Sequence, residues 1–198
     1  MTKDTEENIV IFIVGGSGTG KSTVAEEMVK RGLFEKVTTC TTRNPREGEI
    51  DGVHYHFLNK EKLFDLYKND ELIEDPTEFS GNYYGCPKSS LMIGKPVVAI
   101  IEYEGVKKAF ENLKNENIKP YYVFLEPLSE KEIKNRLSTR KGATEKELKE
   151  RLAAREIEKE WGNFPYDLRI HQDENLGKNE QIDKAINQMK NLVFEDQS

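Results

Sequence analysis

The residues with the clearest chemical meaning form a glycine-rich loop near the start of the chain. Residues 15–22 read GGSGTGKS, which satisfies the spacing G-x-x-x-x-G-K-[ST]. Glycines let backbone N–H groups come close to phosphate oxygens, and Lys21 adds a positive charge that can reach the β and γ phosphates. The hydroxyl of Ser22 is a ligand for Mg²⁺ in such loops. The loop therefore predicts a binding site for a nucleoside triphosphate.

The two segments that flank this loop predict the elements that position it. Residues 9–14 (IVIFIV) form a continuous apolar run, which is typical of a strand buried on both faces. Residues 21–32 (KSTVAEEMVKRG) are helix formers closed by a glycine. A strand, the loop and a helix in this order are the context in which the motif binds phosphate.

The same alternation of strand and helix continues along the chain. It predicts an α/β fold with a central parallel sheet flanked by helices. Ser129 is a candidate helix cap, with Glu132 at the capping-box position. The further expected strands are 95–101, 120–127 (bounded by Pro120 and Pro127) and 168–172, and the further expected helices are 104–115, 129–139 and 179–192.

Two segments do not follow the alternation. Residues 36–93 are rich in Thr, Tyr, Gly and charge and contain short strand-like pieces, whereas residues 131–160 are helical with interleaved Lys, Arg and Glu. We interpret both as insertions above the carboxyl edge of the sheet, where α/β proteins bind their ligands.

Composition narrows the class of protein. The chain has 198 residues, close to one domain, and 30 basic against 36 acidic residues give a net charge of −6. A general nucleic-acid binder would carry a basic excess, so we expect no such partner. Cys40 and Cys86 have neither disulfide nor zinc spacing, and the acidic start with its short apolar run predicts neither a signal peptide nor a membrane span. We expect a cytoplasmic protein with no membrane partner.

Three further motifs give the chain a family resemblance. Residues 38–57 read TTCTTRNPREGEIDGVHYHF, residues 71–85 read ELIEDPTEFSGNYYG, and residues 136–140 read RLSTR, with a further Arg151. Together with the loop, and in the same order, they resemble the guanylate kinase family of P-loop nucleoside monophosphate kinases. The resemblance implies phosphoryl transfer from Mg-ATP to GMP, and to dGMP, without a covalent intermediate.

The resemblance also implies a three-part kinase domain over residues 1–198, as a monomer or homodimer. Its core would be 1–35, 94–130 and 161–198, its monophosphate-binding region 36–93, and its lid 131–160. The implied ATP-binding residues are Gly15, Gly16, Ser17, Gly18, Thr19, Gly20, Lys21, Ser22 and Thr23, with Ser22 as the metal ligand.

Arg43 and Arg46 are the first candidates for the acceptor site. Two guanidinium groups three residues apart suit forked contacts with a phosphate dianion, although arginines on a solvated surface would show the same spacing. Glu74 is the candidate base reader, because a carboxylate accepts hydrogen bonds from the adjacent N1–H and N2 amine of guanine, whereas the N1 of adenine would repel it. The implied GMP-binding residues are Thr39, Arg43, Arg46, Tyr55, Glu74, Tyr84, Cys86 and Glu102.

The arginines of the lid segment complete the implied catalytic set. Arg136 and Arg140 lie four residues apart on one helical face, a spacing of like charges that is tolerable where an anion binds. A solvated face paired with nearby glutamates is the alternative. By resemblance, the catalytic residues are Lys21, Arg43, Arg136, Arg140 and Arg151.

Two positions depart from the family pattern. Cys86 stands where the family has a Ser or Thr, and Ile100 stands at the first acid of the D-x-D pattern, whose second acid is retained as Glu102. Two alternatives to a guanylate kinase therefore stay open. One is a nucleoside monophosphate kinase with another base specificity, and the other is a non-catalytic module of the same fold that binds phosphopeptides.

Overall fold

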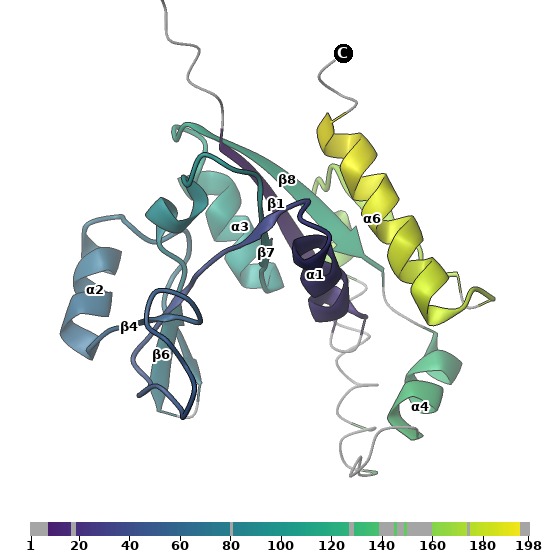
Figure 1. Ribbon diagram of the computed structural model, residues 1–198, viewed down its shortest axis with the longest axis horizontal. Helices are drawn as coiled ribbons and strands as arrows, with labels where there is room; N and C mark the ends of the chain where they lie inside the picture. Colours follow the sequence, from purple (N-terminus) through teal and green to yellow (C-terminus); the bar gives the residue numbers. More distant parts are fainter. Residues whose placement is uncertain are drawn as a thin grey trace, which may run out of the picture.

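A five-stranded parallel sheet forms the centre of the computed structural model (Figure 1). The structure describes residues 8–16, 19–79, 81–126, 129–138, 145, 149, 160–173 and 175–194. The strand order is β2-β7-β1-β8-β9, and each neighbouring pair runs parallel. The strands are β1 (Asn8–Gly15), β2 (Glu35–Lys36), β7 (Val97–Ile100), β8 (Ile118–Leu125) and β9 (Leu168–Ile170).

Strand β1 is the middle of this sheet and is buried on both faces. Val10, Phe12 and Val14 pack into one apolar cluster, and Ile11 and Ile13 pack into another. All five side chains are 0% exposed. The continuous apolar run of the sequence therefore corresponds to a doubly covered strand, as predicted.

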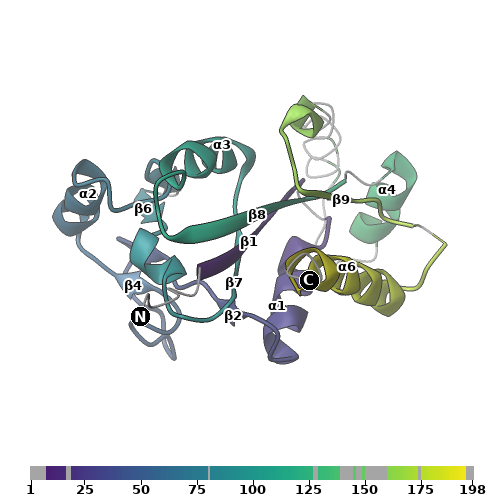
Figure 2. The same cartoon turned by 90° about the horizontal axis from the view of Figure 1, so that it is seen from above.

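Helices cover the two faces of the sheet (Figure 2). Helices α1 (Lys21–Lys30) and α6 (Lys178–Phe194) pack on the side of Ile11 and Ile13, through residues such as Met28 and Met189. Helix α3 (Tyr103–Asn112) packs on the opposite side, through Val106 and Ala109. The predicted fold class, an α/β fold with a parallel sheet flanked by helices, is confirmed.

One predicted strand boundary is wrong. Strand β8 does not begin at Pro120 but at Ile118, so the proline lies inside the strand. Pro120 is in register with Val10 of β1, whereas β9 pairs only with residues 123–125 of β8. Because no described strand borders β8 on its second side at Pro120, the missing N–H group takes no ladder hydrogen bond away.

Residues 36–93 contain more regular structure than the sequence indicated. A second sheet has the order β4-β3-β6-β5, and helix α2 (Lys60–Lys68) begins where the Asn59 side chain accepts a hydrogen bond from the Lys62 N–H at 2.8 Å. The charged surface of α2 hid its periodicity. The remaining elements of the segment are β3 (Cys40–Thr41), β4 (His56–Phe57), β5 (Thr77–Phe79), β6 (Asn82–Gly85) and a 3-10 turn η1 (Lys88–Leu91).

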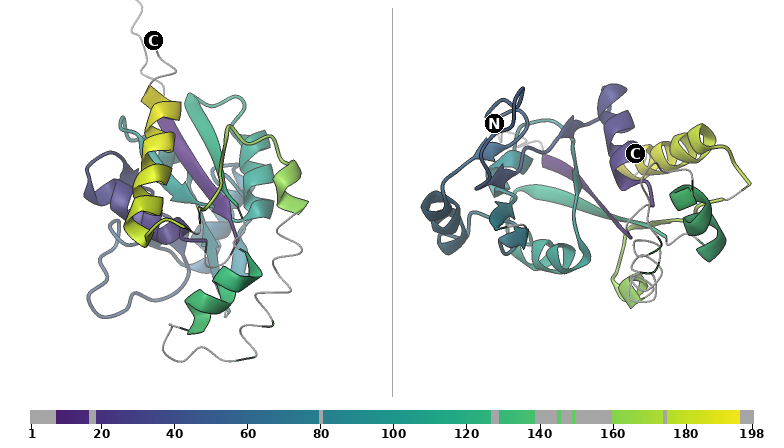
Figure 3. Two further views of the ribbon diagram at one scale, coloured as in Figure 1. Left: turned by 90° about the vertical axis from the view of Figure 1, so that its right-hand side faces the viewer. Right: turned by 90° about the horizontal axis from the view of Figure 1, so that it is seen from below.

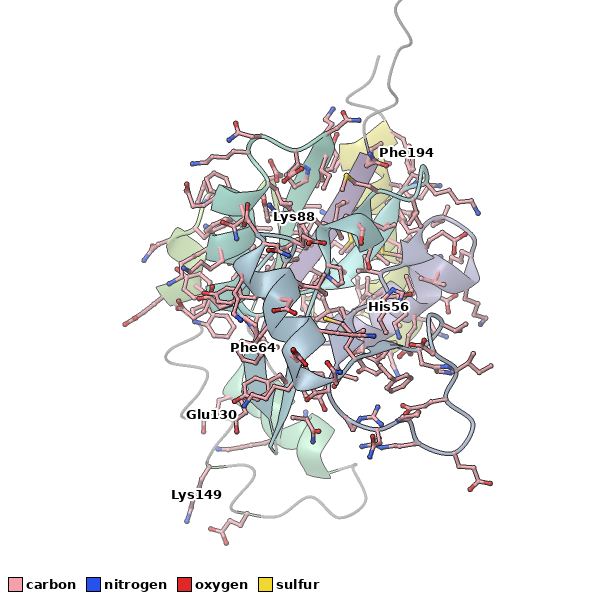
Figure 4. The ribbon with its side chains drawn as sticks, turned by 90° about the vertical axis from the view of Figure 1, so that its left-hand side faces the viewer. His56, Phe64, Lys88, Glu130, Lys149 and Phe194 are labelled. Carbon is pink, nitrogen blue, oxygen red and sulfur yellow. The ribbon has the colours of Figure 1, made fainter. Side chains whose placement is uncertain are left out.

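The second sheet and α2 lie at one end of the molecule, as the right-hand view of Figure 3 shows. A buried lysine joins this end to the central sheet. Lys88, labelled in Figure 4, is 7% exposed and forms ion pairs with Asp70 after α2 (3.0 Å) and with Glu116 after α3 (2.9 Å). The two carboxylates compensate the burial of the ammonium group, which would be costly without partners.

Helix α4 (Glu130–Ser138) lies at the opposite end of the molecule (Figure 1). The Ser129 hydroxyl accepts a hydrogen bond from the Glu132 N–H at 3.1 Å, so the predicted cap is confirmed. Most of residues 139–159 lie outside the described residues, and the chain is described again from Glu160, ahead of the 3-10 turn η2 (Trp161–Asn163). Within the described part, none of the helices combines the length and apolar character that a membrane crossing requires.

Candidate functional site

The glycine-rich loop starts where β1 meets the end of β8. A Cβ atom on Gly15 would lie 2.6 Å from the carbonyl oxygen of Leu125, so only glycine fits between the two strands. The Lys21 ammonium group folds back over the loop and donates to the carbonyl oxygens of Gly15 (2.5 Å) and Gly16 (3.0 Å). The lysine therefore lies at the mouth of the loop, where it can exchange these carbonyls for phosphate oxygens.

The Gln172 side chain holds the far side of the loop. Its amide donates to the carbonyl oxygens of Thr19 (2.9 Å) and Glu126 (3.3 Å), which links the loop to the end of β8. Gln172 stands where the family of the resemblance often has an Asn near adenine, but it was not among the predicted site residues. Its position directly after the strand 168–170 was the available signal, since polar residues at the carboxyl ends of parallel strands face the ligand site.

A cavity of about 980 Å³ opens next to the loop. Gly16, the start of α1 from Lys21 to Val24, the ends of β8 and β9, and the first half of α6 line it. The contribution of α6 was not predicted. Of the nine predicted ATP-binding residues, six line the cavity: Gly16, Thr19, Gly20, Lys21, Ser22 and Thr23. Gly15 does not line it, and Ser17 and Gly18 lie outside the described residues.

The same cavity reaches the end of β7. Ile100 and Glu102 both line it, and the Ile100 side chain is 42% exposed. An apolar side chain therefore faces the phosphate region at the position where the sequence departs from the acidic pattern. Among the described residues, no group of three or more His, Cys, Asp or Glu side chains could hold a metal ion, and the Ser22 hydroxyl remains the candidate ligand beside the phosphates.

A second group of side chains surrounds Arg43. The guanidinium group donates to both carboxylate oxygens of Glu49, at 2.8 and 2.9 Å. Its Cζ atom lies 5.5 Å from the centre of the Tyr55 ring, and that ring meets Tyr84 edge to face at 6.3 Å. The structure thus brings together Arg43, Tyr55 and Tyr84, three of the residues that the resemblance implies for GMP binding.

Glu49 orients Arg43 in this group, and it was not among the site residues predicted from the sequence. Besides Arg43, it accepts a hydrogen bond from the Arg46 N–H at 2.6 Å. The Arg43 hydrogen bonds and that N–H lower the pKa of Glu49 to about 2, so the carboxylate is ionised at neutral pH. A carboxylate six residues after Arg43 in a tight loop was the available signal for Glu49.

Two other predicted acceptor residues lie nearby in the same segment. The Arg46 side chain is exposed. The Thr39 carbonyl oxygen accepts a hydrogen bond from the His56 N–H at 2.8 Å.

Glu74 belongs to a third group, with Glu102 and the two cysteines. Burial raises the pKa of Glu74 to about 7, and repulsion from Glu102 and Asp75 adds to the shift. Cys86 is 3% exposed, and burial raises the pKa of its thiol, so the thiol is neutral. Its Sγ atom lies 3.9 Å from the carbonyl oxygen of Pro87, a weak hydrogen bond. Glu74, Cys86 and Glu102 therefore lie in one neighbourhood.

The predicted lid arginines are only partly described. Arg136 belongs to α4, but its side chain lies outside the described part of the structure, and Arg140 and Arg151 lie outside it entirely. The geometry of the site therefore consists of the phosphate cavity, the Arg43 group and the Glu74 group. Glu102 lines the cavity and also acts on Glu74, so it connects the first with the third.

Comparison with known proteins agrees with this geometry. The family model described as "Guanylate kinase" matches residues 7–196. The guanylate kinase of Clostridium tetani is 40% identical over 139 residues, which span 68% of this chain and 64% of that protein's length. The guanylate kinases of Bacillus cereus (strain ATCC 14579) and Bacillus subtilis (strain 168) are 34% and 31% identical, and each match spans 96% of this chain and 89% of the relative.

A solved structure shows the same fold. The crystal structure of guanylate kinase from Anaplasma phagocytophilum superposes with a TM-score of 0.57 at 23% identity. The match covers 97% of this chain and 88% of that one.

The raised pKa of Glu74 makes a prediction about stability. The folded chain binds the Glu74 proton more tightly than the unfolded chain, so between about pH 4.5 and pH 7 wild-type stability falls as pH rises. Glu74→Gln removes the titration and keeps the shape. We expect the variant to match the wild type below about pH 4.5 and to be more stable by roughly 3 kcal/mol above pH 7.

Urea unfolding at several pH values measures this difference. Glu104→Gln, at an exposed position of α3, is the matched control and should show no such trend. A difference between Glu74→Gln and wild type that stays constant with pH would contradict the burial of an ionisable carboxyl.

Proposed function

Because the chain belongs to the guanylate kinase family, a family of ATP-dependent nucleoside monophosphate kinases, we propose that it transfers the γ-phosphoryl group of Mg-ATP to GMP, giving ADP and GDP. We include dGMP as a second acceptor. One observation carries the proposal: the cavity beside the phosphate loop reaches Glu102, and Glu102 neighbours Glu74. A donor site for phosphates and an acceptor site for a base are thereby adjacent.

On the donor side, residues Gly15–Thr23 would bind ATP. Backbone N–H groups of the loop and of the first turn of α1 would bind the phosphates, and Lys21, which lines the cavity, would neutralise their charge. Magnesium ions prefer oxygen ligands and are bound largely through substrate phosphates. The Ser22 hydroxyl would supply the protein ligand, and the ion would supply charge neutralisation at the transferring group.

On the acceptor side, Arg43 and Arg46 would hold the GMP phosphate, with Tyr55, Tyr84 and Thr39 assisting. Arg43 is already oriented by Glu49 and lies beside the Tyr55 ring, so little side-chain freedom is left to lose on binding. Phosphate and Glu49 would share the guanidinium donors, since Arg offers five N–H groups.

Glu74 would read the guanine base, with Cys86 and Glu102 beside it. The N1–H and N2 amine of guanine would supply two donors to the Glu74 carboxyl group, whose pKa burial raises to about 7. Hydrogen bonds from the base favour the ionised form, so GMP binding would release the proton of Glu74.

Two segments would close over the core of residues 1–35, 94–130 and 161–198. We propose that 36–93 brings GMP toward the loop and that the lid 131–160 brings Arg136, Arg140 and Arg151 to the transferring phosphoryl group. Closure excludes water, which would otherwise hydrolyse ATP, and holds the reacting groups in line.

The proposal is tested by ADP release from Mg-ATP with GMP, dGMP, AMP, CMP, UMP or dTMP as the acceptor. We expect turnover with GMP and dGMP only, and a loss of at least about 100-fold in kcat for Lys21→Ala, because one preorganised positive group is removed. Undiminished turnover in Lys21→Ala would show that the site is elsewhere. Silence with every acceptor, from folded protein that binds ATP, would favour the non-catalytic phosphopeptide-binding module.

Glu49 gives a second test on the acceptor side. Glu49→Gln weakens the forked pair that orients Arg43, so we expect the KM for GMP to rise about tenfold with the KM for ATP unchanged. Asp65→Asn is the control, because that acid pairs with Lys68 at the surface of the same segment. Equal effects of the two variants on the GMP KM would contradict the role of Glu49.

A second candidate function is a nucleoside monophosphate kinase with another base specificity. The buried Cys86 thiol favours it, because the thiol hydrogen-bonds weakly and already faces the Pro87 carbonyl. If the weak thiol limits guanine recognition, Cys86→Ser should raise kcat/KM for GMP by several-fold, about 1 kcal/mol of one added hydrogen bond. An unchanged or lower value would argue against this limitation.

A further inference from the structure

Helix α3 contains a glycine in its first turn that its backbone does not require. Gly105 is helical and does not belong to the described glycines with positive φ. Glycine is less favourable than alanine at such positions because it loses more conformational freedom on folding. The reason for glycine must therefore be the space beside its Cα atom.

The Glu74 carboxyl group occupies that space. A Cβ atom on Gly105 would lie 1.9 Å from Oε2 and 3.1 Å from Cδ of Glu74. The first distance is far below van der Waals contact, and the second is tighter than most contacts that Cβ atoms make. A further neighbour is Cγ1 of Ile101, at 2.9 Å. Alanine at this position would have to displace the carboxyl group, the Ile101 side chain or both.

The backbone next to Glu74 is fixed by other contacts. The Ile73 N–H donates to the Cys86 carbonyl oxygen at 3.0 Å, and the Ile73 carbonyl oxygen accepts from the Asn112 side chain at 3.1 Å. Asn112 is the last residue of α3, so both ends of this helix contact the segment that carries Glu74. Because the backbone is held, a clash at Gly105 would be relieved by the Glu74 side chain.

Charge does not hold the Glu74 carboxyl in place. The groups that act on it electrostatically are Glu102 and Asp75, both acidic, and Lys108 pairs with Asp75 at 3.6 Å instead. Glu74 also acts on the neutral thiols of Cys40 and Cys86. Among the described residues, Glu74 forms no ion pair, so the shape of the α3 surface sets its direction.

We propose that Gly105 is a positioning residue for base selectivity: its missing side chain admits the Glu74 carboxyl to the surface of α3, and this contact aims the carboxyl at the N1–H and the exocyclic amine of guanine. The inference rests on the proposed function, since it concerns the same acceptor site. Gly105 itself touches no substrate in this account and acts through Glu74.

The test compares Gly105→Ala with the control Glu104→Ala, the neighbouring exposed residue of the same helix. Each is assayed with GMP and with IMP, which lacks the exocyclic amine, at varied ATP. For Gly105→Ala we expect the KM for GMP to rise by about 10- to 100-fold, the KM for ATP to stay unchanged, and the preference for GMP over IMP to fall. Glu104→Ala should change none of these quantities.

A second comparison in the Glu74→Asp background distinguishes a clash of the added methyl group with Glu74 from a clash with Ile101. Aspartate is one methylene shorter, so its carboxyl is withdrawn from the added methyl group. Gly105→Ala should then raise the GMP KM much less in the Glu74→Asp background than in wild type. The same fold-increase in both backgrounds would assign the effect to Ile101 and overturn the proposal.

The remaining outcomes are also decisive. If Gly105→Ala alone does not fold, recovery of soluble protein in Glu74→Asp/Gly105→Ala would support the contact, and failure of both would overturn it. An active wild type with an unchanged GMP-to-IMP preference in Gly105→Ala would overturn the inference alone. A wild type that makes no GDP would instead overturn the proposed function and, with it, the role of Gly105.

Discussion

The burial of β1 between two apolar layers is the constraint on which the rest of the structure depends. Its alternate side chains pack against α3 on one face and against α1 and α6 on the other. Packing on both faces fixes the position of β1 relative to these helices. Gly15 at the end of the strand lies against Leu125, with no room for a side chain. The position of β1 also determines where the glycine-rich loop, the start of α1 and the cavity beside them lie. The apolar core therefore sets the position of the charged site.

The Arg43 group and the Glu74 group have opposite electrostatic environments. Arg43 has a partner before substrate arrives, because Glu49 accepts both of its forked hydrogen bonds. Glu74 has acidic neighbours and burial instead, and its pKa rises to about 7. The first arrangement, the Arg43–Glu49 pair, orients a cation at little cost in stability. The second arrangement keeps the Glu74 carboxyl group buried beside acidic groups until hydrogen-bond donors bind to it. Under the proposed function, selectivity for a base with two adjacent donors would follow from the second arrangement, because such a base would compensate the buried charge.

The sequence predicted the features that local patterns carry. The apolar run of β1, the loop with its lysine and the cap at Ser129 all depend on residues close together in the chain. The motif containing Arg43, Tyr55 and Tyr84 was predicted through family resemblance. The contact between Gly105 and Glu74 could not be predicted, because it joins residues from two separate segments and depends on how α3 packs. Helix α2 was not predicted, because its many charged residues obscured the helical spacing of its apolar residues. The start of β8 was wrongly predicted at Pro120, because the order of strands in the sheet decides where a strand tolerates proline.

We expect the γ-phosphoryl group to move from ATP to GMP rather than to water. This is measured by incubating the protein with Mg²⁺, GMP and ATP labelled in the γ-phosphate, and separating the products by chromatography. The label should appear in GDP in an amount equal to the ADP formed. Label that appears only as inorganic phosphate, or that stays in ATP although the folded protein binds both nucleotides, would contradict it.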